Sequence, residues 1–125
     1  MATKYVAGLL LTLCITPAFA AGLAPFQSES LKTIENVRTG KPFILMLWSL
    51  DCPPCMREFE VLQRQRDRIP SSALVLISTD TEAQPSEIET MLERFGMTAF
   101  ENWVFADHFV ERLRYAIDPQ WFGEL

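Results

Sequence analysis

The 125-residue sequence contains few of the side chains that bind metals or polyanions. It has a single histidine, His108, and eleven lysine and arginine residues against sixteen acidic residues. Its net charge of −5 opposes binding to nucleic acid or to an anionic membrane surface, because both attract positively charged proteins. We therefore expect no nucleic-acid partner.

No apolar run in the sequence is long enough to form a permanent transmembrane helix. The apolar segment 5–15 has roughly eleven residues, whereas a spanning helix needs about 20. Lys4 precedes this segment, and Ala18 and Ala20 supply the small residues that a signal peptidase requires. The sequence therefore predicts a signal peptide over residues 1–20, with cleavage after Ala20 and export to the periplasm.

Cysteine is also scarce, with three residues in the chain. Cleavage after Ala20 would remove Cys14 and leave Cys52 and Cys55. Export would place this pair in an oxidising compartment, where two nearby thiols are either joined in a disulfide or actively kept reduced. The pair can therefore be a structural disulfide, part of a metal site or a redox centre.

Apolar runs alternate with amphipathic segments along the chain. The two strongest runs are typical of strands buried on both faces. The expected strands are 42–50, 73–79 and 103–107, and the expected helices are 31–37, 53–68, 86–95 and 107–117. The third helix should begin with a capping box of Ser86 and Glu89. This alternation predicts one α/β domain over residues 21–125, with a parallel sheet core and flanking helices.

Cys52 and Cys55 lie where a strand pattern changes into a helix pattern, with Pro53 and Pro54 between them. The free N–H groups and the positive end of the helix dipole favour a thiolate on Cys52. Pro53 is tolerated in the first helical turn, and Pro54 stiffens the turn that keeps Cys55 within reach. We expect Cys52 to attack a substrate disulfide and Cys55, the more buried thiol, to resolve the mixed disulfide.

Two other interpretations of the pair remain open. A structural zinc site needs about four protein ligands, and His108 is the only histidine that could join the cysteines. Two thiolates and His108 could still hold Cu(I), as in a copper chaperone. A purely structural disulfide closing so short a loop would stabilise the fold little. For the redox interpretation we expect no metal and no other cofactor.

The segment 40–59 reads GKPFILMLWSLDCPPCMREF and resembles the thioredoxin superfamily, in particular the TlpA/ResA-like exported thiol:disulfide oxidoreductases. Gly40–Pro42 resembles their lead-in to a buried strand, Trp48 their tryptophan four residues before the first cysteine, and Glu58 a frequent acidic residue. The resemblance implies a thioredoxin-like fold and a monomer that reduces disulfides of exported proteins, in cytochrome c maturation or copper-site assembly. It also implies a membrane-anchored electron donor. We expect the two cysteines to be tuned by Trp48, Asp51, Pro53, Pro54 and Glu58.

The chain departs from this family at several positions. Asp51 replaces an aromatic or small residue, and its carboxylate would raise the pKa of the Cys52 thiol. Met46 stands where thioredoxins bury an aspartate, and Glu60 replaces a proline that kinks the helix. The family continues with a cis-proline, two antiparallel strands and a closing helix, which we expect to be missing after the final segment 118–125. A non-catalytic thioredoxin-like remnant is therefore a third alternative.

Overall fold

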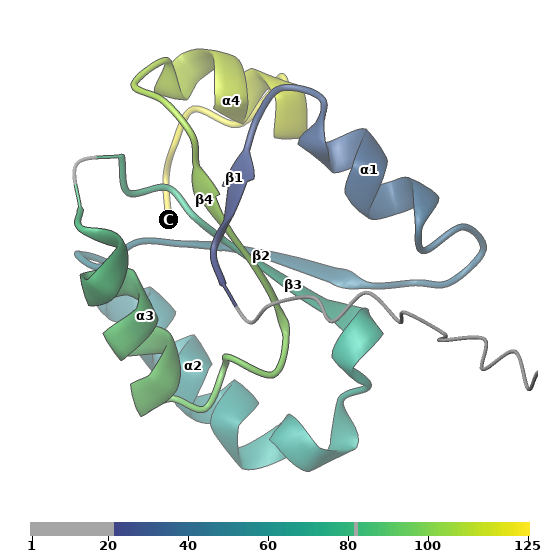
Figure 1. The fold of residues 1–125 in the computed structure, drawn as a ribbon, viewed down its shortest axis with the longest axis vertical. Coiled ribbons are helices and arrows are strands. Elements are labelled where there is room, and N and C mark those ends of the chain that lie inside the picture. The colour runs from purple at the N-terminus through teal and green to yellow at the C-terminus, as the bar shows by residue number, and fades with distance from the viewer. Residues whose placement is uncertain (1–21, 82) are drawn as a thin grey trace, which may run out of the picture.

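The apolar runs of the sequence form parallel strands, and the segments between them form helices that lie on both faces of the sheet (Figure 1). The computed structural model describes residues 22–81 and 83–125. The strands are β1 (Ala24–Phe26), β2 (Ile44–Trp48), β3 (Leu74–Ser78) and β4 (Glu101–Phe105). The helices are α1 (Ser30–Asn36), α2 (Pro53–Gln65), α3 (Pro85–Arg94) and α4 (Val110–Ile117), with short 3-10 helices η1 (Arg66–Arg68) and η2 (Ser71–Ala73). The predicted α/β class and parallel core are confirmed.

The predicted signal peptide, its cleavage site and Cys14 lie outside the described residues. Within residues 22–81 and 83–125, each helix is too short or too polar to cross a membrane.

The described strands are ordered β1-β4-β3-β2, and every pairing between them is parallel. Central β3 is buried along its whole length, as expected for a strand covered on both faces. The same expectation for the run 42–50 is wrong. Within the described residues β2 pairs on one side only, and Ile44 is 58% exposed. The hydrophobic pattern could not reveal which of the two strands occupies the edge of the sheet.

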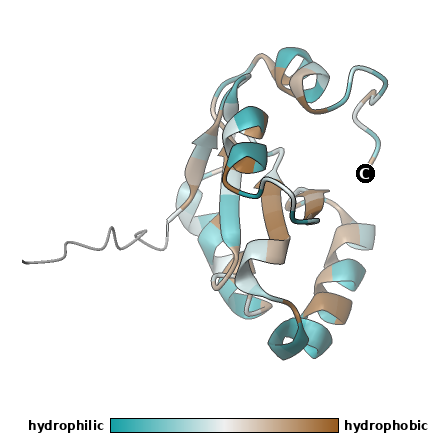
Figure 2. Ribbon diagram, turned by 90° about the vertical axis from the view of Figure 1, so that its right-hand side faces the viewer, coloured by the Kyte–Doolittle hydropathy of each residue, from teal (hydrophilic) through white to brown (hydrophobic). Residues whose placement is uncertain are grey.

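Alternate residues of β3 point into two separate core layers. Leu74 and Leu76 pack with the apolar residues of α2 and α3, and Val75 and Ile77 pack with those of α1 and α4. Much of the hydrophobic colour in Figure 2 lies on the strands, while the helices mix hydrophobic and hydrophilic stretches. The two cysteines belong to the layer that contains α2 and α3.

Two helix starts differ from the predictions. The capping box of α3 consists of Gln84 and Glu87, and the Gln84 N–H donates to Glu87 Oε2 at 2.8 Å. The predicted box of Ser86 and Glu89 is therefore wrong by two residues, because the helix already begins at Pro85. α4 begins at Val110 and not at residue 107, and Asp107 is not its N-cap, because its Oδ1 accepts a hydrogen bond from the Phe109 N–H at 2.8 Å in the turn before the helix.

Strand β1 was not predicted, and β4 begins two residues earlier than expected. β1 has three residues and includes Pro25, so it is too short to show a strand pattern. It exists because it pairs with β4, with Phe26 opposite Phe105 in the register. This is a long-range interaction that no local window of sequence displays.

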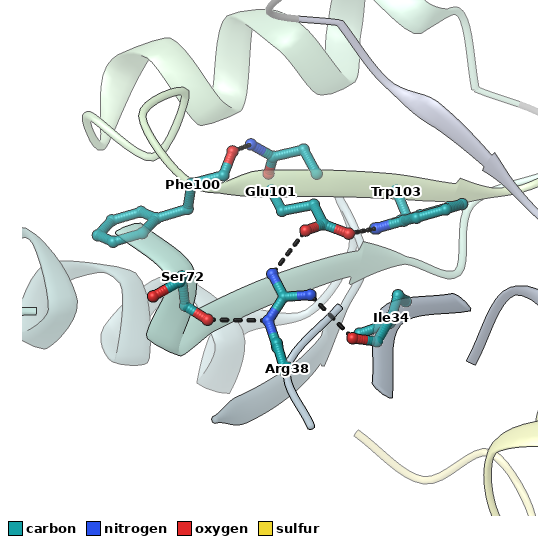
Figure 3. A network of polar contacts seen from close by, with 7 residues as sticks. Ile34, Arg38, Ser72, Phe100, Glu101 and Trp103 are labelled. Atoms are coloured by element: carbon teal, nitrogen blue, oxygen red, sulfur yellow. Dashed lines mark hydrogen bonds and ion pairs between the residues drawn. The ribbon is translucent and has the colours of Figure 1, made fainter. Parts of the chain in front are cut away.

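The side chain of Arg38, which is 6% exposed, ties α1 to the sheet (Figure 3). Its Nε donates to the Ser72 carbonyl at 2.8 Å, and its Nη1 donates to the Ile34 carbonyl at 3.1 Å. Its Nη2 forms an ion pair with Glu101 Oε2. The other carboxylate oxygen of Glu101 accepts a hydrogen bond from Trp103 Nε1 at 2.7 Å. One buried guanidinium thus joins α1, the turn before β3 and strand β4.

Candidate active site

Cys52 and Cys55 lie together at the start of α2, as predicted. Cys52 caps the helix and Cys55 is its third residue. Their sulfur atoms are at disulfide distance, and their Cα atoms are 5.2 Å apart, which lies in the usual range for a disulfide. Helix α2 therefore presents a closed dithiol pair at its N-terminus.

The first backbone donor of α2 points at the sulfur of Cys52. The Cys55 N–H donates to Cys52 Sγ at 3.2 Å. Pro53 and Pro54 occupy the first two positions of the helix and have no N–H group. The Cys55 N–H is therefore the first that the helix offers. In the reduced protein this hydrogen bond and the helix dipole both favour a thiolate on Cys52.

The expected difference in exposure between the two cysteines is not found. In the disulfide form Cys52 is 4% exposed and Cys55 is 5% exposed. Both belong to the core cluster that also contains Trp48 and Phe59. The two cysteines therefore differ in their position on the helix and not in burial, because Cys52 caps it and Cys55 lies within its first turn.

The other predicted tuning residues fall into two groups. Trp48 is 1% exposed and its ring packs edge-to-face on Phe59, with ring centroids 4.9 Å apart. Its Nε1 lacks a hydrogen-bond partner among the described residues. Asp51 and Glu58 are exposed, one on each side of the cysteine pair along the chain. Trp48 thus supports the disulfide from the core, and the two carboxylates are in contact with solvent.

A groove of about 440 Å³ runs beside the disulfide, between β2 and the first turns of α2. Cys55 and Pro54 form part of its lining, and Leu62 and Leu125 contribute apolar surface. Of the described residues that line it, only Glu58 is charged. The disulfide therefore has an apolar surface on the Cys55 side.

His108 is not brought into a site with the cysteines. It follows β4, which is separated from β2 by β3 in the strand order. In the part of the chain that the structure describes, no three His, Cys, Asp or Glu side chains are grouped so that they could hold a metal ion. The structure therefore gives no support to the copper alternative.

The sequence did not reveal the polar pair of Ser78 and Asp80, which contacts the segment that carries Cys52. Asp80 Oδ2 accepts a hydrogen bond from the Leu50 N–H at 3.0 Å, two residues before Cys52. The one signal was the position of residues 78–80 at the end of a strand pattern, and it becomes informative only once that strand is known to neighbour the cysteine-bearing strand. Carboxyl ends of neighbouring parallel strands meet at the same edge of a sheet, so polar residues there were candidates.

We expect replacement of Asp51 by alanine to lower the pKa of the Cys52 thiol, because it removes a negative charge next to the thiolate. Since Asp51 is exposed and screened by water, the gain in alkylation rate of the reduced protein at pH 7 should be roughly two- to fivefold. Asp67→Asn is the matched control, because this side chain is 93% exposed and lies beyond α2. Equal rates in the two variants would contradict a role of Asp51 in tuning the thiol.

No protein-family model matches this chain, and no curated protein or solved structure matches it significantly. The function is therefore inferred from the geometry of the cysteine pair and from the sequence pattern of segment 40–59.

Proposed function

We propose that this chain is a thiol:disulfide oxidoreductase with a thioredoxin-like fold that reduces disulfides of exported proteins. The observation that carries the proposal is the Cys52–Cys55 pair at the start of α2, with the Cys55 N–H donating to Cys52 Sγ. A parallel sheet with helices on both faces is compatible with that fold. The helix start makes Cys52 the better leaving group and the better nucleophile near neutral pH.

The proposed reaction begins with the pair reduced. The Cys52 thiolate attacks one sulfur of a substrate disulfide, the Cys52–substrate bond forms, and the other substrate sulfur leaves as a thiolate and takes up a proton. Cys55 then loses its proton and attacks Cys52 Sγ, which releases the second substrate thiol. Two electrons pass from the protein to the substrate, and the Cys52–Cys55 disulfide closes as in the structure.

Another dithiol must reopen the disulfide after each turnover. The resemblance of segment 40–59 to the TlpA/ResA-like proteins supports a membrane-anchored donor, and it also supports the reductive direction. The predicted signal peptide over residues 1–20 supports export to the periplasm, and we propose that the protein acts there as a monomer. Its substrates would be exported proteins with disulfides at cysteines needed for cytochrome c maturation or copper-site assembly.

The test is reduction of insulin disulfides by dithiothreitol, followed as turbidity, with and without the protein. Wild type should accelerate the reaction, and the double variant Cys52→Ser/Cys55→Ser should leave it at the rate of the blank. A wild type no faster than the double variant would reject catalysis and favour a non-catalytic thioredoxin-like remnant. A redox potential near that of the strong oxidant DsbA, roughly −120 mV, would reject the reductive direction but not catalysis.

A further inference from the structure

The four residues between β2 and α2, residues 49–52, carry Cys52 from the sheet to the helix. The segment ends at Cys52, which is fixed to the helix because its carbonyl accepts a hydrogen bond from the Met56 N–H at 3.2 Å. Within the segment, the Leu50 N–H donates to Asp80 Oδ2 at 3.0 Å. Asp80 follows β3, so this bond joins the cysteine segment to the central strand of the sheet.

The carboxylate of Asp80 is itself held in place. Its Oδ2 also accepts a hydrogen bond from Ser78 Oγ at 2.7 Å, and Ser78 Oγ accepts from the Asp80 N–H at 3.1 Å. Ser78 is fully buried at the end of β3, and its partner in the strand register is Trp48. The Thr79 N–H donates to the Trp48 carbonyl at 2.9 Å. The acceptor for Leu50 is thus held at the end of the central, fully buried strand β3.

We infer that Asp80 is a positioning residue for the redox pair, an inference that rests on the proposed function. Asp80 transfers no electron and no proton. It holds the segment that carries Cys52, and so it keeps Cys52 Sγ within bonding reach of Cys55. A hydrogen bond to a carboxylate is stronger than one between neutral groups, and this one lies two residues from the reacting sulfur.

Loss of this anchor should weaken the disulfide relative to the dithiol. Closing the disulfide requires Cys52 and Cys55 to be held close together, so a looser segment lowers the effective concentration of one thiol at the other. The relevant equilibrium is dithiol plus oxidised glutathione giving protein disulfide plus two reduced glutathione molecules. The equilibrium constant of this reaction should fall when the Asp80 anchor is lost. A residue that only stabilises the fold would stabilise the oxidised and the reduced protein equally, so its loss would leave the constant unchanged.

Three variants of the full chain separate geometry from charge and from general stability. Asp80→Ala removes the acceptor and should lower the constant by roughly tenfold, which corresponds to about 30 mV. Asp80→Asn should stay within about twofold of wild type, because both hydrogen bonds end on the single oxygen Oδ2, which an amide oxygen can replace. Asp107→Ala is the matched control, because this half-buried carboxylate likewise accepts a backbone N–H and a side-chain bond but lies after β4. It should leave the constant unchanged.

An unchanged constant in Asp80→Ala, or an equal fall in Asp80→Asn, would overturn the inference. Should Asp80→Ala fail to fold, Ser78→Ala replaces it, since it removes one of the two bonds to Oδ2. We expect a smaller fall in the constant for that variant, and no fall would overturn the inference. The glutathione equilibrium is measured whether or not insulin is reduced. Failure of the positioning role and failure of the proposed catalysis are therefore seen in different experiments.

Discussion

A Cys55→Ser variant, expressed in an exporting host, should accumulate mixed disulfides with its substrates, while Cys52→Ser should accumulate almost none. In Cys55→Ser the thiol at the helix start still attacks a substrate disulfide, but no second thiol remains to release the product. In Cys52→Ser the remaining thiol of Cys55 lies inside the first turn of α2 and not at its cap, so the free N–H groups at the helix start favour its thiolate less. We expect at least roughly tenfold more adduct from Cys55→Ser.

The adducts are measured on non-reducing gels and identified by mass spectrometry after reduction. The double variant Cys52→Ser/Cys55→Ser is the blank for adducts formed through other thiols. Equal adduct yields from the two single variants would show that the helix start does not distinguish the cysteines. A larger yield from Cys52→Ser would reverse the proposed roles.

Replacement of Arg38 by alanine should cause a large loss of stability, although Arg38 lies outside the site. The change leaves the carbonyls of Ile34 and Ser72 without their donor and Glu101 without its cation. Removing one partner of a buried ion pair costs about 3–5 kcal/mol, and the lower end applies because the Glu101 side chain is 34% exposed. Since small domains have about 5–15 kcal/mol of stability, much of the total would be lost.

The free energy of unfolding is measured by urea titration of the oxidised protein with circular dichroism. Arg112→Ala is the matched control, because Arg112 also has one ion pair, to Asp107 at 2.7 Å, but its side chain is 59% exposed. Such an exposed pair is worth about 0–1 kcal/mol. A loss in Arg38→Ala no greater than that in Arg112→Ala would contradict the role of Arg38 in joining α1 to the sheet.

The features that the sequence predicted correctly are those with a local signal. Pro53 at the first helical position marks the start of α2 to the residue, since proline is favoured in the first turn of a helix and disfavoured in its interior. Cys52 and Cys55 are three residues apart in sequence, so one helical turn is enough to bring their sulfur atoms together. The run around β3 was recognisable because a strand covered on both faces is apolar at every position.

The features that were missed depend on partners distant in sequence. The edge position of β2 follows from the strand order, which an apolar run does not contain. Arg38 and Glu101 are 63 residues apart, and each taken alone resembles an ordinary surface charge. The contact of Asp80 with Leu50 likewise spans 30 residues. It becomes visible only once β2 and β3 are known to be neighbours.

The pKa of the Cys52 thiol in the reduced protein tests the central claim most directly. Alkylation by iodoacetamide is followed as a function of pH, and the labelled cysteine is identified by mass spectrometry at low conversion. Because the Cys55 N–H and the helix dipole favour the thiolate, Cys52 should be labelled first, with a pKa clearly below the ordinary cysteine value of about 8.5. A Cys52 pKa at or above that value, or labelling of Cys55 first, would contradict the assignment of Cys52 as the activated nucleophile.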